Sequence, residues 1–99
     1  MLKIVDKMIE SFQDELDGAK EYSEKYLENK AINNMSRAQK FKDMASDELR
    51  HASYMYEFAI QDMNELKRIY ELPTEDQEHW KRALKRYAEC MAWIKQTLE

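Results

Sequence analysis

Apolar residues recur at alternating steps of three and four along almost the whole chain, and turn-forming residues interrupt this pattern only twice. Such spacing keeps one face of an α-helix apolar, because the helix has about 3.6 residues per turn. The 99 residues include one glycine and one proline, which leaves few positions for the turns of a strand-rich fold. The sequence therefore predicts an all-α chain with a single domain, residues 1–99.

The two interruptions divide the chain into three expected helices. We expect them at residues 2–28, 35–71 and 74–99. The asparagines between the first two helices suit a turn and an N-cap, so these helices form a long antiparallel hairpin. Pro73 ends the second helix, and Thr74 with Gln77 predicts a capping box at the start of the C-terminal helix.

The second helix is long for a chain of this size. At a rise of 1.5 Å per residue it measures about 55 Å, whereas a compact chain of about 100 residues has a radius of gyration of about 13 Å. A domain this short buries only about 60–65% of its unfolded surface, so its own core is marginal. We therefore expect this helix either to kink or to pack partly on something beyond its hairpin partner.

Each of the first two helices carries one glutamate in its otherwise apolar seam, Glu15 in the first and Glu48 in the second. A buried carboxylate is costly unless it is paired, protonated or bound to a cation. Glu15 lies 16 residues before the expected turn centre at Ala31, and Glu48 lies 17 residues after it. In an antiparallel hairpin each carboxylate is then about 25 Å from the turn, so the two should meet at the same height.

A histidine completes a candidate metal site. His51 follows Glu48 by three residues, and such positions project from the same side of a helix. Carboxylates with one imidazole nitrogen suit iron or manganese better than calcium or a structural zinc. A full di-metal site in a helix bundle takes a Glu from each of two helices and a Glu-x-x-His from each of two others. A homodimer, or a larger even-numbered assembly, would supply the missing half, because a two-fold contact duplicates each ligand.

These residues also have ordinary structural interpretations. If the seams are drawn one residue wrong, both glutamates are flank residues that pair with Lys20, Lys42 or Arg50. Tyr22, on the seam of the first helix, is either a core aromatic or a hydrogen-bond donor to a metal-bound carboxylate. The sequence leaves these alternatives open.

Three other positions are interpreted as structural. Asp76 and His79 repeat the i, i+3 spacing, and we interpret them as part of the acidic first turn of the third helix, where the helix dipole favours carboxylates. Gly18 costs about 1 kcal/mol relative to alanine in the middle of a helix, so we expect it to permit a close approach. Cys90, the only cysteine, is interpreted as small buried packing and fits a reducing compartment.

The residues around the candidate ligands resemble the ferritin-like superfamily. Glu15 with Tyr22 seven residues later is similar to the first metal-binding helix of ferritins and rubrerythrins, and Glu48-x-x-His51 is similar to the second. The chain looks most like the encapsulated ferritins, which are short chains with one hairpin. The resemblance implies a ferritin-like four-helix bundle completed by dimerisation, with two iron ions per dimer bound by Glu15, Glu48 and His51 and with Tyr22 beside them.

The resemblance also implies a function, that of a di-iron carboxylate protein of the ferroxidase type, which oxidises Fe(II) with O₂ or peroxide and sequesters iron. Manganese is the alternative metal. A metal-free helical interaction module with the same hairpin is the competing function, and a monomeric three-helix bundle with all its acids outside is a further alternative.

Charge and hydropathy narrow the classes of partner. The net charge is −4 with both signs interspersed, which argues against a nucleic-acid partner. No stretch approaches the roughly 20 apolar residues that a membrane span requires. The expected location is the cytoplasm or the interior of a protein compartment.

Overall fold

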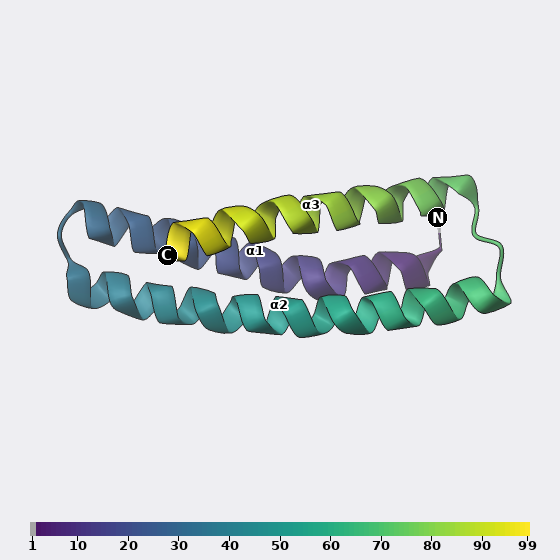
Figure 1. Cartoon of the computed structure of the whole chain (residues 1–99), viewed down its shortest axis with the longest axis horizontal. Helices are drawn as coiled ribbons and strands as arrows, with labels where there is room; N and C mark the ends of the chain where they lie inside the picture. Colours follow the sequence, from purple (N-terminus) through teal and green to yellow (C-terminus); the bar gives the residue numbers. More distant parts are fainter. Residues whose placement is uncertain (1) are drawn as a thin grey trace.

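The computed structural model describes residues 2–99, which form three long α-helices. They are α1 (Lys3–Ala31), α2 (Met35–Ile69) and α3 (Thr74–Leu98), so the all-α prediction is confirmed. α1 and α2 form the expected antiparallel hairpin. α3 lies along this hairpin and runs back from the end of α2 toward the loop that joins α1 to α2 (Figure 1). The resulting rod measures 53 × 20 × 19 Å.

The loop between α1 and α2 is shorter than the pattern suggests. α1 continues to Ala31, because Asn29 is accommodated inside the helix, where its side chain donates to the carbonyl four residues earlier at 2.8 Å. Asn33 adopts a φ of 60°, a left-handed conformation that asparagine tolerates. The side chain of Asn34 accepts a hydrogen bond from the main-chain N–H of Arg37 at 3.3 Å, which confirms the expected N-cap of α2.

The connection from α2 to α3 corrects one detail of the prediction. α2 ends at Ile69, two residues earlier than expected. The predicted capping box is wrong, because Thr74 is already the first residue of α3 and Pro73 holds the N-cap position without a side-chain hydrogen bond. The side-chain amide of Gln77 instead donates to the carbonyl of Leu72 at 2.7 Å.

Small side chains line the contact between α1 and α2. Four alanines of α2 recur every seven residues and are at most 2% exposed: Ala38, Ala45, Ala52 and Ala59. A seven-residue repeat keeps one side of a helix against its neighbour over many turns. Short side chains also allow helix axes to approach the lower end of the usual range of about 8–10 Å. α2 therefore packs along α1 as one uninterrupted helix.

An aromatic cluster packs α3 against one side of the hairpin. Phe12 of α1 is fully buried, and its ring makes edge contacts with Tyr56 of α2 and with Trp80 and Tyr87 of α3, at centroid distances of 5.4, 6.2 and 5.5 Å. The rings of Tyr56 and Tyr87 stack at 3.9 Å. Each such pair contributes about 0.5–1.5 kcal/mol beyond the burial of its area. The cluster thus decides which side of the hairpin α3 covers.

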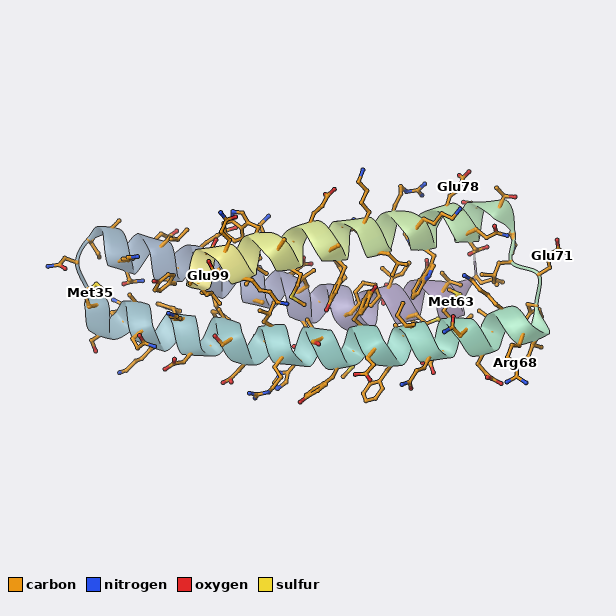
Figure 2. The ribbon with its side chains drawn as sticks, viewed as in Figure 1. Met35, Met63, Arg68, Glu71, Glu78 and Glu99 are labelled. Carbon is orange, nitrogen blue, oxygen red and sulfur yellow. The ribbon has the colours of Figure 1, made fainter. Side chains whose placement is uncertain are left out.

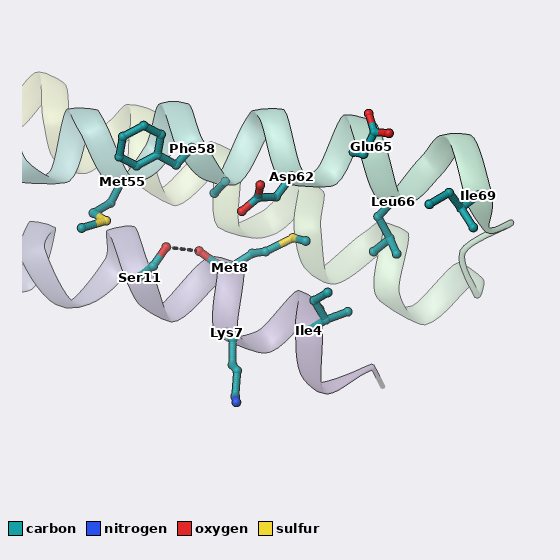
Figure 3. A pocket seen from close by; sticks show the side chains of 11 residues that line it. Ile4, Lys7, Met8, Ser11, Met55, Phe58, Asp62, Glu65, Leu66 and Ile69 are labelled. Atoms are coloured by element: carbon teal, nitrogen blue, oxygen red, sulfur yellow. Dashed lines mark hydrogen bonds between the residues drawn. The ribbon is translucent and has the colours of Figure 1, made fainter.

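The opposite side of the hairpin, called the open face below, has no helix over it among residues 2–99. It consists of the edge of α2 that carries Met44, Met55 and Phe58 and the edge of α1 that carries Ile4 and Ser11. A groove of about 500 Å³ runs along this face and is lined only by residues of α1 and α2. In Figure 3 the side chains of this groove lie in front, and α3 lies behind the hairpin.

Charged side chains cover the outside of the rod. Figure 2 shows Arg68 of α2 and Glu78 of α3 projecting away from it, whereas Met63 of α2 is only 1% exposed. No helix within residues 2–99 combines the length with the apolar composition that a membrane span requires.

Candidate metal centre

Three candidate ligands converge from the facing sides of α1 and α2. Glu15, Glu48 and His51 each offer one ligand atom, and these atoms all lie within 4.8 Å of one another. The Nδ1 atom of His51 lies 3.8 Å from the Oε2 atom of Glu15. The structure thus brings the three side chains together at one height in the hairpin, as their spacing predicts. That they bind a metal ion stays a prediction.

The three ligands lie at the border of the core rather than inside it. The Glu15 side chain is 32% exposed and that of His51 is 48% exposed, and Glu48 is half-buried. The expectation that both glutamates occupy fully buried seam positions is therefore wrong for the single chain. Leu16, next to Glu15, and Ala52, next to His51, are fully buried instead, so the line of contact runs through such neighbours and the glutamates border the open face.

Gly18 makes room for one of the carboxylates. A Cβ atom at this position would lie 3.1 Å from the Oε2 atom of Glu48, which is closer than ordinary van der Waals contact. The absence of a side chain therefore allows the Glu48 carboxylate to lie against the backbone of α1. The close approach expected at this glycine is confirmed, and the group that approaches is a candidate ligand.

The two carboxylates face each other without a lysine or an arginine between them. Glu15 raises the pKa of Glu48, mainly because the two carboxyl groups share a hydrogen bond; burial raises it further, and His51 acts in the opposite direction. Arg50 lies 3.3 Å from Asp47 instead. Among the ion pairs of residues 2–99, none joins either glutamate to a lysine or an arginine. The flank position that the alternative interpretation expects is thus observed, whereas its pairing with a lysine or an arginine is not, and a divalent cation would supply the missing positive charge.

Tyr22 has a packing role in the single chain. It is half-buried, and its ring stacks on Phe41 of α2 with a centroid distance of 6.3 Å and an interplanar angle of 26°. Lys25 lies over the other partner of this stack, with its Nζ atom 6.0 Å from the centre of the Phe41 ring. The core-aromatic interpretation of Tyr22 therefore has direct support, whereas its role as a donor to a metal-bound carboxylate stays a prediction.

The second acid-and-histidine pair joins α3 to the start of α1. Asp76 is in the first turn of α3, as expected, but it is also 1% exposed. Its Oδ1 atom accepts a hydrogen bond from the main-chain N–H of Leu2 at 2.8 Å. His79 lies 3.6 Å from Asp6 through its Nε2 atom. Pattern alone missed this burial, because the partner of Asp76 is 74 residues away.

The donor set defines what the centre can do chemically. Two carboxylates and one imidazole offer several oxygens and one nitrogen, and carboxylates are able to bridge two metal ions. Glu15, Glu48 and His51 would hold such an ion, which would supply redox chemistry that these side chains lack. Since the three side chains border the open face, an ion would reach them from outside the chain.

Comparison of the chain with protein-family models, with curated proteins and with solved structures finds no match. The resemblance to the ferritin-like superfamily therefore stays a prediction that depends on a few residues of α1 and α2. The geometry of the three candidate ligands supports a functional proposal without reference to a relative.

Proposed function

We propose that this chain is a ferritin-like di-iron carboxylate protein that oxidises Fe(II), with the metal site at the interface of a homodimer. The observation that carries the proposal is the meeting of Glu15, Glu48 and His51 from two helices, with ligand atoms within 4.8 Å of one another. A donor set rich in carboxylates with one nitrogen favours Fe(II), with Mn(II) as the alternative. The position of these residues beside the open face leaves room for the ligands of a second copy.

In this proposal the protein holds two Fe(II) ions close together and balances their charge. Two copies contribute Glu15 and Glu48 twice, and His51 ligates through a neutral imidazole nitrogen. The two Fe(II) ions are the substrate. Each gives one electron to O₂, which takes up two protons and leaves as H₂O₂; with peroxide as the oxidant the product is water. The expected role is detoxification of iron or its supply to an iron store.

Oxygen consumption tests the proposal. Fe(II) is added anaerobically to the native protein, to Glu48→Ala and to Glu57→Ala, and oxygen is then admitted. Glu57 is an exposed acid of the same helix, outside the candidate site, so it is the matched control. We expect the native protein and the control to consume oxygen well above the protein-free rate and Glu48→Ala to fall to that rate. Equal rates in native protein and Glu48→Ala would contradict the proposal.

A second function, that of a metal-free interaction module, is favoured by the apolar groove that adjoins the candidate site on the open face. It predicts that protein purified with iron or manganese present holds no stoichiometric metal. It also predicts that a chelator leaves the midpoint of thermal unfolding unchanged. The di-iron proposal predicts bound metal and a lower midpoint after chelation, because a ligand that binds only the folded protein stabilises it.

A further inference from the structure

Along the exposed edge of α2, the side chains that precede the candidate ligands mirror those that follow them. Glu48 and His51 are at the centre. Met44 lies four residues before Glu48, and Met55 lies four residues after His51. Both methionines belong to the open face, at 41% and 37% exposure. Identical side chains thus lie at equal distances on the two sides of the candidate metal ligands.

The symmetry extends through two more pairs. Phe41 lies three residues before Met44, and Phe58 lies three residues after Met55. Arg37 then lies four residues before Phe41, and Asp62 lies four residues after Phe58. Steps of three and four keep all of these positions on one edge of the helix. The outermost pair, Arg37 and Asp62, is not identical like the inner pairs but has opposite charges.

We propose that a second copy of the chain packs antiparallel on the open face, with α2 against α2, about a two-fold axis that passes midway between Glu48 and His51. This inference rests on the proposed function, in which the second copy completes the metal site. A two-fold axis perpendicular to the helices places each residue opposite the one at the same distance beyond the axis. Met44 then faces Met55 of the second copy, and Glu48 faces its His51.

The charges select the antiparallel direction. Arg37 and Asp62 lie about 19 Å from the axis on opposite sides, at a rise of 1.5 Å per residue. In the antiparallel dimer, Arg37 therefore faces Asp62 of the second copy, and this pair forms twice. In a parallel dimer, α2 of one copy would lie over α1 of the other copy. Asp62 would then lie opposite Ile4 of the second copy, and Arg37 would lie opposite its Asn29. Neither charge would then have an oppositely charged residue directly opposite it at the same height.

The proposed two-fold axis passes α1 midway between Glu15 and Gly18, at the height where it passes α2. Gly18 adjoins Glu48 and Glu15 adjoins His51, so the point midway between Glu15 and Gly18 lies level with the centre of the α2 edge. Glu15 of one copy then faces Gly18 of the other. The Glu15 carboxylate thus lies opposite the contact between Gly18 and Glu48 of the other copy, which brings the acidic candidate ligands of the two copies together.

Shape is complementary farther from the axis. Ser11 lies four residues before Glu15 and Tyr22 lies four residues after Gly18, so a small side chain faces a large one. The groove of about 500 Å³ has Ser11 and Phe58 in its lining. In the antiparallel dimer the side chains that enter this groove are Tyr22 and Phe41 of the second copy.

The open face is large enough for a stable interface. Residues 37–62 of α2 span about 38 Å, and a layer of two helices is about 20 Å wide. The face therefore offers on the order of 800 Å² per copy, which is the usual size of a specific interface. Apart from the candidate metal ligands at its centre, the face carries apolar side chains on both sides of the axis and charges near its ends, and a charged rim is typical of protein interfaces.

Charge reversal tests the register. Arg37→Asp alone and Asp62→Arg alone each place like charges together in their own homodimer, whereas a mixture of the two variants restores both ion pairs in the heterodimer. One variant is isotope-labelled, and the mixture is analysed by native mass spectrometry with Mn(II) present. We expect heterodimers well above the random half of all dimers, and each variant alone to dissociate about 10-fold more readily than native protein.

The matched control is Arg50→Asp, a reversal of the same kind on an exposed residue whose partner is Asp47 of its own helix. This variant should dimerise as the native protein does, and in a mixture with native protein it should form heterodimers at the random proportion. Random mixing of the two test variants, with native-like dimers of each, overturns the antiparallel register but leaves the oxygen assay free to support the di-iron function. A heterodimer preference in protein that binds no iron supports the register and contradicts that function. A chain that stays monomeric with Mn(II) and with Fe(II) overturns both.

Discussion

Replacing Gly18 with alanine separates two effects that meet at this residue. In the middle of an exposed helix, alanine is about 1 kcal/mol more favourable than glycine. The new Cβ atom would lie 3.1 Å from the Oε2 atom of Glu48, so the carboxylate must rotate away, at a cost of about 0.5–1.5 kcal/mol for a rotation of about 30°. Gain and cost nearly cancel in the metal-free protein. Its free energy of unfolding, measured with urea, should therefore change by less than about 1 kcal/mol.

For metal binding, the gain in helix stability at Gly18 does not offset the displacement of Glu48. Because Gly18→Ala displaces a ligand, we expect the affinity for Mn(II) to fall by about 10–100-fold, the usual effect of losing a group that orients a ligand. Electron paramagnetic resonance of free Mn(II) measures this directly. In a Glu48→Ala background the same substitution should stabilise the protein by the full 1 kcal/mol or so and leave residual Mn(II) binding unchanged. Native-like Mn(II) affinity in Gly18→Ala would refute the assignment of Glu48 as a ligand.

Three other substitutions test the site and its support. Because Glu15 raises the pKa of Glu48 in the folded protein, the metal-free protein loses stability as pH rises through that pKa. Glu48→Gln should therefore be more stable than native protein in urea by about 0.2–1 kcal/mol at pH 7 and should converge with it near pH 4; a less stable variant at pH 7 would contradict this. Phe12→Ala should lower the free energy of unfolding by about 3–5 kcal/mol, whereas Leu27→Ala, at a residue that is 42% exposed, should change it by less than about 0.5 kcal/mol; equal losses would argue against the aromatic cluster. Ala52→Leu should cost about 1–3 kcal/mol and weaken Mn(II) binding, because it forces apart the two helices that carry the ligands; unchanged binding would show that close helix packing does not set the ligand distance.

Local pattern was enough to predict the helices and the height of the candidate ligands. The rise of a helix is constant, so the distances of Glu15 and Glu48 from the loop fix where they meet. The three-residue step from Glu48 to His51 fixes their common side. These features depend only on the spacing of residues within a hairpin. For that reason the convergence of the three side chains could be predicted before any contact was known.

The exposure of individual side chains on the hairpin could not be predicted in the same way, because it depends on which side of the hairpin α3 covers. That choice is made by an aromatic cluster to which all three helices contribute, and no short stretch of sequence indicates it. Consequently Phe58 lies on the open face at 54% exposure. Cys90 is half-buried rather than fully buried, and this partial burial raises the pKa of its thiol.

Molar mass and metal content of one sample, measured together, test the central claim most directly. The protein is mixed with Fe(II) under anaerobic conditions and analysed by size-exclusion chromatography with light scattering, and the iron in the peak is quantified. The proposed site predicts about twice the chain mass of 12.0 kDa with one iron ion per chain, and no bound iron in Glu48→Ala. A metal-free particle of 12.0 kDa from the native protein would contradict the claim that two copies share a di-iron site.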